Sequence, residues 1–115
     1  MSGGWGSGAG AIAGPPGPTG PAGGGFVAVT TAADYTAATG QFVIVDASGG
    51  PVTVTLPAIT EDGLTVKVAK GDNSVNEVTV AVDAAPETIV GAATYKLAVQ
   101  YHSVLVVSDA SNWFI

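Results

Sequence analysis

Cysteine and arginine are absent from this 115-residue chain, and histidine and lysine are scarce. Without cysteine, disulfides, thiolate metal sites and cysteine nucleophiles are excluded. The single histidine, His102, cannot form a multi-histidine metal site. Three lysines against nine acidic residues leave a net charge of −6, whereas tight phosphate binding needs clustered basic side chains. We therefore expect no nucleic-acid partner and no membrane contact.

Charged side chains of either sign are also few, at 10% of the chain, compared with about 25% in typical soluble domains. Either other subunits cover much of the surface, or threonine and serine make it neutral. No apolar run approaches the roughly 20 residues of a membrane span. The N-terminus has neither the basic nor the apolar segment of a secretory signal.

The sequence contains no convincing set of catalytic residues. Ser103, His102 and Asp109 could be imagined as a triad, but no nucleophile elbow or oxyanion-loop motif surrounds them. Glu61 and Asp62 are adjacent in a turn, whereas the carboxylates of glycosidases oppose one another across a cleft. We predict a protein that is not an enzyme, with no catalytic or metal-binding residues and no cofactor.

The composition divides the chain near residue 25. Residues 1–25 hold 11 of the 17 glycines, four of the seven prolines and no charged side chain. Such a segment cannot bury enough apolar area to fold alone. We assign residues 1–25 to an extended anchor and collagen-like arm, and residues 26–115 to one β domain.

Glycine recurs at every third position of the arm: Gly14, Gly17, Gly20 and Gly23. The triplets read Gly-Pro-Pro, Gly-Pro-Thr and Gly-Pro-Ala, the collagen pattern, in which only glycine fits at the axis of three wound chains. Three triplets are too few to hold a triple helix unaided, so the alternative is a stiff polyproline linker. We favour three-chain packing because the register is kept over four glycines.

Two apolar side chains, Trp5 and Ile12, precede the triplets in a stretch rich in glycine, alanine and serine. A lone tryptophan in such a tail is either incidental or an anchor whose ring is buried in a partner's pocket. We predict that Trp5 and Ile12 anchor the arm on another protein.

Downstream of the arm, the hydrophobic pattern has period two. Apolar and polar residues alternate in the stretches that begin at Val52, Leu64 and Val78, which places one side-chain set on each face of a strand. Turn signals such as Gly-Asp-Asn at 71–73 recur at intervals of roughly 8–12 residues. The pattern predicts an all-β fold, a small antiparallel β-sandwich or barrel-like domain, with helical turns possible only at 31–39.

The segment 104–107, Val-Leu-Val-Val, is apolar on both faces and needs cover on both sides. Neighbouring copies around a threefold axis could supply this cover, as could a central position in a monomeric sandwich. The C-terminal residues Trp113, Phe114 and Ile115 are expected to close the core. The candidates for sugar stacking are Tyr35, Tyr95, Tyr101, Trp113 and Phe114.

The order of these segments resembles small β domains of bacteriophage tail-fibre and virion-fibre proteins, which often follow a collagen-like segment. The resemblance covers about residues 26–115 and lies in VTVTLP from Val52, LTVKVAK from Leu64, NEVTV from Asn76, ETIVG from Glu87, YHSVLVVSD from Tyr101, and Asn112-Trp113. It implies a homotrimer without catalytic residues. A tail fibre, a head fibre and a capsid decoration protein all remain open, because the chain lacks a long shaft and a separate receptor-binding tip.

Together these features lead us to expect a phage virion structural protein that assembles in the host cytoplasm. Its arm, residues 1–25, would dock on a capsid or tail protein. The alternative is an adhesin-like module that binds host-surface glycan weakly.

Overall fold

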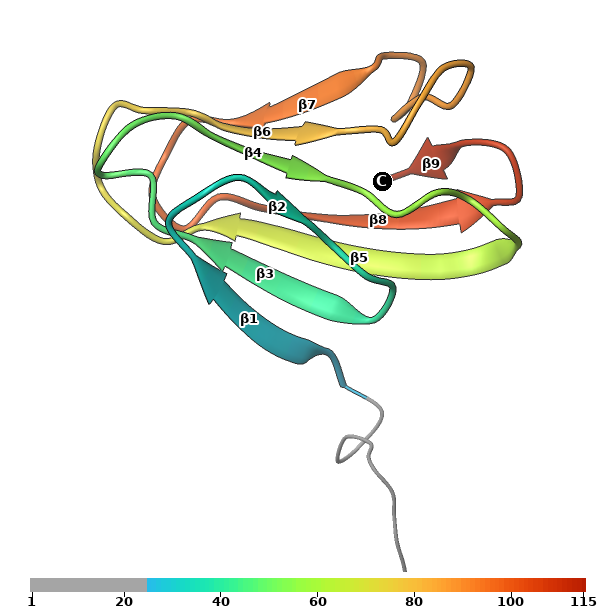
Figure 1. The fold of residues 1–115 in the computed structure, drawn as a ribbon, viewed down its shortest axis with the longest axis horizontal. Coiled ribbons are helices and arrows are strands. Elements are labelled where there is room, and N and C mark those ends of the chain that lie inside the picture. Colours follow the sequence, from blue (N-terminus) through green and yellow to red (C-terminus); the bar gives the residue numbers. More distant parts are fainter. Residues whose placement is uncertain (1–24) are drawn as a thin grey trace, which may run out of the picture.

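The computed structural model describes residues 25–115, and every regular element in this range is a β-strand. The strands are β1 (Val27–Thr31), β2 (Tyr35–Thr36), β3 (Gln41–Val45), β4 (Val52–Thr55), β5 (Asp62–Lys70), β6 (Val78–Ala81), β7 (Thr94–Leu97), β8 (Ser103–Asp109) and β9 (Trp113–Phe114). A five-stranded sheet, β1-β3-β5-β8-β9, packs against a four-stranded sheet, β2-β4-β6-β7 (Figure 1). The predicted all-β class is confirmed. Between residues 25 and 115 there is no helix that could cross a membrane.

From β1 to β6 the chain alternates between the two sheets. Odd-numbered strands join the five-stranded sheet and even-numbered strands join the four-stranded sheet. Each strand from β3 to β6 pairs in parallel with the strand two before it. A parallel pair needs a crossover connection, and here a strand of the opposite sheet provides it.

The last three strands each pair antiparallel with an earlier strand: β7 with β6, β8 with β5, and β9 with β8. Both sheets are therefore mixed, and the prediction of an antiparallel sandwich is wrong in strand direction. A period-two pattern reports which face a side chain occupies, but it carries no information on the direction of the neighbouring strand.

The segment 31–39 is not helical. The hydroxyl of Thr31 bonds locally to the backbone of Ala33, which offers the chain a turn in place of a helix. Strand β2 follows, and the N–H of Ala37 donates to the carbonyl of Thr55 at 2.8 Å. This segment therefore forms an edge strand of the four-stranded sheet.

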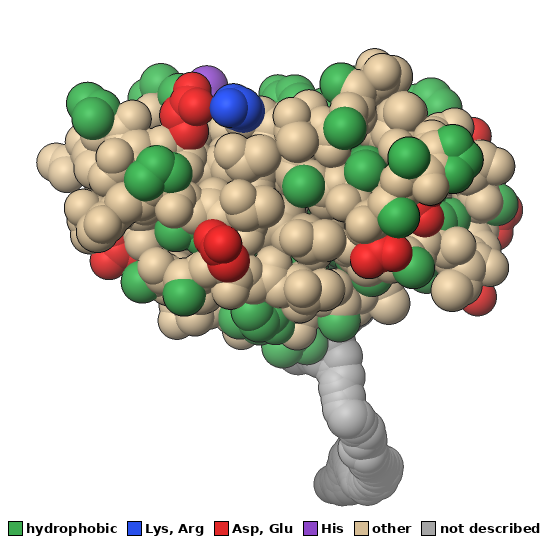
Figure 2. Space-filling model, turned by 45° about the horizontal axis from the view of Figure 1, so that its top comes forward, with side chains coloured by type: hydrophobic (Ala, Val, Ile, Leu, Met, Phe, Trp, Pro, Cys, Tyr) green, Lys and Arg blue, Asp and Glu red, His purple; other side chains and the backbone are tan. Residues whose placement is uncertain are grey.

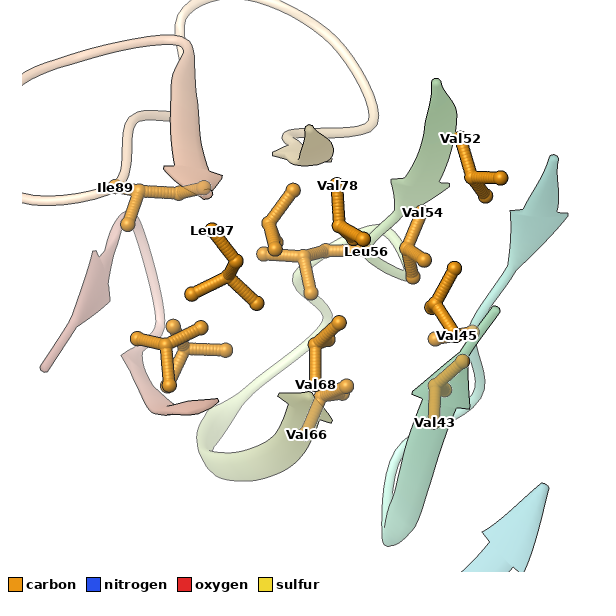
Figure 3. Close-up of a cluster of buried hydrophobic side chains, with 14 of the residues drawn as sticks. Val43, Val45, Val52, Val54, Leu56, Val66, Val68, Val78, Ile89 and Leu97 are labelled. Atoms are coloured by element: carbon orange, nitrogen blue, oxygen red, sulfur yellow. The ribbon is translucent and has the colours of Figure 1, made fainter. Parts of the chain in front are cut away.

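The core lies between the two layers and consists mainly of valine, whose β-branched side chain suits a pleated surface. Its fully buried members include Val43, Val45, Val54, Val66, Val68, Val78, Val80, Leu56, Ile89, Leu97 and Trp113 (Figure 3). Among the three C-terminal residues, only Trp113 closes the core, at 0% exposed. Phe114 is exposed because neighbouring residues of a strand point to opposite faces. Ile115, which follows the strand, is exposed as well.

Candidate functional site

An open groove lies where three parallel strands end. The carboxyl ends of the parallel strands β1, β3 and β5 lie next to one another. The groove beside these strand ends has a volume of about 710 Å³. Hydroxyl, amide and carboxylate groups line it, among them Thr30, Asp46, Asp72, Asn73 and Gln100. The carboxyl ends of parallel strands form binding crevices in many α/β proteins. In residues 25–115 of this chain, the corresponding strand ends occur in a fold whose regular elements are all strands.

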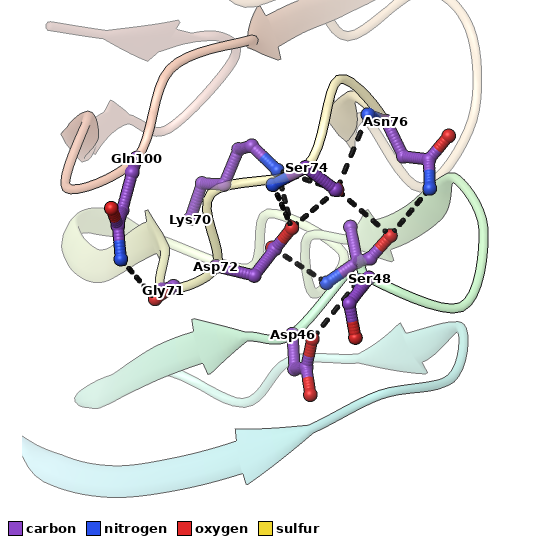
Figure 4. Close-up of polar contacts among 9 residues, drawn as sticks. Asp46, Ser48, Lys70, Gly71, Asp72, Ser74, Asn76 and Gln100 are labelled. Carbon is purple, nitrogen blue, oxygen red and sulfur yellow. Dashed lines mark hydrogen bonds and ion pairs between the residues drawn. The ribbon is translucent and has the colours of Figure 1, made fainter.

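The carboxylate of Asp72 ties the loop after β5 to the loop after β3 (Figure 4). It accepts hydrogen bonds from the N–H of Ala47 at 2.7 Å and from Lys70 Nζ at 2.8 Å. Ser74 donates its N–H to the same carboxylate at 3.0 Å, and the Asn76 amide donates to the carbonyl of Ala47 at 2.8 Å. The two loops that flank the groove therefore belong to one continuous hydrogen-bonded network.

Lys70 and Asp72 form a buried ion pair, with side chains 0% and 9% exposed. Burial disfavours the ionised form of Asp72. The hydrogen bonds from Lys70, Ser74 and Ala47 outweigh this effect and hold the pKa of Asp72 well below its ordinary value. Asp72 is thus ionised at neutral pH and paired with a lysine, which makes this part of the groove wall a structural element.

Gly71 lets the loop after β5 pass close to β3. Its N–H donates to the carbonyl of Val45 at 2.7 Å, and a Cβ at this position would lie 3.1 Å from Cγ2 of Ile44. The amide of Gln100 donates to the Gly71 carbonyl at 3.2 Å, so the loop between β7 and β8 is held at the groove as well.

Asp46 is the exposed carboxylate of the groove. The N–H of Ser48 donates to it at 2.9 Å, and hydrogen bonding from Ser48 holds the pKa of Asp46 below its ordinary value. An ionised carboxylate beside amide and hydroxyl groups can accept hydrogen bonds from the hydroxyls of a neutral polar ligand. No three His, Asp or Glu side chains between residues 25 and 115 come close enough to hold a metal ion.

A second surface, on the outer side of the five-stranded sheet, is apolar. The strand register places Phe42, Lys67 and Leu105 side by side, with Ile44, Val107 and Phe114 in the adjacent rows. We call Phe42, Ile44, Leu105, Val107 and Phe114 the outer apolar face. The last three of these are 42%, 38% and 48% exposed, so strand β8 is apolar on both sides, as its sequence predicts.

Lys67 is the basic side chain of this outer side. Its Nζ lies 4.8 Å from the centroid of the Phe42 ring, where the cation is attracted to the ring face and the aliphatic stem covers apolar surface. The other two lysines pair with carboxylates, Lys70 with Asp72 and Lys96 with Glu77. Within residues 25–115, Lys67 forms no ion pair.

The side chains imagined as a catalytic triad do not come together. His102 is exposed in the turn before β8, and its backbone bonds to Val99 and Lys70. Ser103 and Asp109 lie at opposite ends of β8, about 20 Å apart at the usual rise per residue.

The five aromatic candidates for sugar stacking are also dispersed. Trp113 is buried, and Tyr35 and Tyr95 pack against the core. Tyr101 and Phe114 are exposed, at 80% and 48%. Tyr101 lies beside the groove, since it follows Gln100, whereas Phe114 pairs with Val107 near the other end of β8.

The predicted anchor residues Trp5 and Ile12 lie outside the described residues, as do the collagen-like glycines Gly14, Gly17, Gly20 and Gly23. The groove, by contrast, has no counterpart among the sequence-based predictions. One signal was present, because Asp46 and Asp72 each follow an alternating apolar run within two residues. That signal indicates a shared site only if the two runs are parallel neighbours.

Comparison with known proteins adds no relative. No protein-family model matches the chain, and no curated protein matches it. The sequence pattern and the two surfaces described above are therefore the features that indicate a function.

Proposed function

We propose that this protein is a bacteriophage virion structural protein, a small trimeric fibre or decoration protein attached to the tail or capsid through residues 1–25. The junction at β1 carries the proposal. The collagen-like triplets end at Gly23, and β1 begins at Val27 as an edge strand of the five-stranded sheet. Three chains wound as a triple helix would bring three β domains together at this edge.

The mechanism we propose is assembly rather than chemistry. Among residues 25–115, strand β1 has a neighbour on one side only. The main-chain groups along its other side would therefore be available to another chain. The valine core gives each copy a rigid unit. Trp5 and Ile12 would anchor each arm, and a buried tryptophan contributes about 2 kcal/mol or more to binding. Three arms on one trimer would add avidity.

Sedimentation of the full chain tests the trimer, which should have about three times the 11.2 kDa mass of one chain. Immunoblots of gradient-purified particles test the attachment. Trp5→Ala should give folded trimers that no longer join the particle, while the control Tyr101→Ala, an exposed aromatic outside the arm, should join normally. A monomeric wild type, or normal incorporation of Trp5→Ala, contradicts the corresponding part of the proposal.

The groove supports a second candidate function, weak binding of a host-surface glycan. Its hydroxyl, amide and carboxylate groups suit sugar hydroxyls, and the exposed Tyr101 follows the lining residue Gln100 in the chain. Saturation-transfer NMR with neutral oligosaccharides of bacterial surface polysaccharides tests this candidate. Asp46→Asn and Tyr101→Ala should reduce the signal, and Phe114→Ala, outside the groove, should not. Equal signals from all three variants would rule the groove out.

A further inference from the structure

The outer apolar face has no cover within residues 25–115. Phe42 and Ile44 lie on β3, between parallel neighbours, and the other three members lie on the antiparallel strands β8 and β9. A sheet face that meets water is normally polar. The four-stranded sheet covers the inner face, where Val104 and Val106 are buried. On the outer face Leu105, Val107 and Phe114 remain between 38% and 48% exposed. A contiguous apolar patch of this kind marks an interaction site.

The distribution of charge indicates which partner this surface fits. The chain carries a net charge of −6, so two copies repel each other in most orientations. In Figure 2, the few charged side chains on the face shown are mostly acidic. The outer apolar face differs, because its five members are uncharged and Lys67 lies between two of them, Phe42 and Leu105. It is therefore the surface through which two acidic copies can approach with little repulsion.

The side of the sheet that carries the outer apolar face also holds two charges of opposite sign, Lys67 and, near one end, Asp109. Lys67 pairs in register with Leu105, and Asp109 lies four residues further along β8, about 13 Å away. Hydrogen bonds from the N–H groups of Asn112 and Ser111 hold the pKa of Asp109 below its ordinary value, so the carboxylate is charged at neutral pH. A copy displaced along the strand would bring its Asp109 towards this Lys67.

The entry point of the arm favours the same partner. Residues 1–24 join the domain at β1, the edge strand of the sheet that carries the outer apolar face. If the triplets ending at Gly23 hold three chains together, the three sheets meet within a few residues of that junction.

From these observations we propose that the outer apolar face is the contact between β domains, buried against further copies of this chain, with Lys67 of one copy directed towards Asp109 of the next. The inference rests on the proposed trimer and names the surface that forms it.

Charge insertion in the full chain tests the contact. Val107→Glu places a carboxylate between Leu105 and Phe114 of the face, and the sedimenting mass should fall from three chains to one. Val75→Glu is the matched control, because Val75 is 93% exposed in the loop before β6, and it should remain trimeric. Circular dichroism checks the fold of each variant, and Phe114→Glu, which should also give monomers, replaces Val107→Glu if the latter does not fold.

Cysteine labelling provides a measurement that leaves the face nearly intact. Because the chain contains no cysteine, Leu105→Cys and Val75→Cys each carry one thiol. Maleimide labelling of Leu105→Cys, relative to the same variant unfolded in urea, should be several-fold slower than that of Val75→Cys. The protection should fall as the protein is diluted towards monomer.

The outcomes separate the contact surface from the trimer itself. A wild-type monomer overturns both the proposed trimer and this inference. A trimer that survives Val107→Glu and Phe114→Glu, with Leu105→Cys labelled as fast as Val75→Cys, overturns only the contact surface. Protection of Leu105→Cys in a monomer, independent of dilution, would show that residues 1–24 of the same chain cover the face, which also overturns the inference.

Discussion

Replacing Val54 by alanine tests the two-layer core at its centre. Val54 is 0% exposed on β4 and lies in register between Tyr35 of β2 and Val80 of β6. The substitution removes two buried methyl groups, and each contributes about 0.8 kcal/mol to the free energy of unfolding. The cavity left behind costs about 1 kcal/mol more. We expect the free energy of unfolding to fall by about 2–3 kcal/mol, a large part of the roughly 5–15 kcal/mol typical of a domain.

Val75→Ala is the matched control because the chemical change is identical and the side chain is 93% exposed. Surface substitutions of this kind change the free energy of unfolding by no more than about 0.5 kcal/mol. The difference between the two variants therefore measures burial alone, apart from the weaker preference of alanine for strands.

Urea unfolding followed by circular dichroism measures both variants, at one protein concentration because association raises apparent stability. In thermal unfolding, Val54→Ala should lower the midpoint by about 8–24 °C, taking about 4–8 °C per kcal/mol for a domain of this size. Equal losses for Val54→Ala and Val75→Ala, or a loss below about 1 kcal/mol at Val54, would refute the packing of the four-stranded sheet on the five-stranded one.

Three further predictions concern the polar groups. Lys70→Met leaves the Asp72 carboxylate without its buried partner and should cost about 3 kcal/mol in urea unfolding, whereas Lys96→Met removes an exposed pair and should cost under about 1 kcal/mol; similar losses would contradict the buried network. Because its pKa is lower in the folded than in the unfolded state, Asp72 stabilises the fold above about pH 4, and this contribution is lost as the pH falls further. The thermal midpoints of wild type and Asp72→Asn should therefore converge towards low pH, and a gap that stays constant with pH would argue against this linkage. EDTA should leave the thermal midpoint unchanged, and a clear drop would reveal a bound metal ion. His102→Ala should also leave it unchanged because the His102 side chain is exposed, and a clear drop would reveal a structural role for His102.

The sequence alone determined how the residues of each strand divide between its two faces. In Gln41–Val45, the alternation assigns Val43 and Val45 to one face and Phe42 and Ile44 to the other, and the structure buries the first pair while leaving the second partly exposed. This succeeds because side-chain direction in a strand is a local property with a period of two residues. The same reasoning correctly made β8 apolar on both sides.

Strand direction and the groove were decided only by the tertiary structure. Asp46 and Asp72 are 26 positions apart in sequence, and they line one groove because β3 and β5 run parallel, with β4 lying between them in the chain but in the opposite sheet. The alternation of apolar residues is the same for parallel and antiparallel neighbours, so no local pattern distinguishes the two arrangements. Direction depends on how each connection crosses between the layers and on which valines then meet in the core, and both are properties of the whole chain.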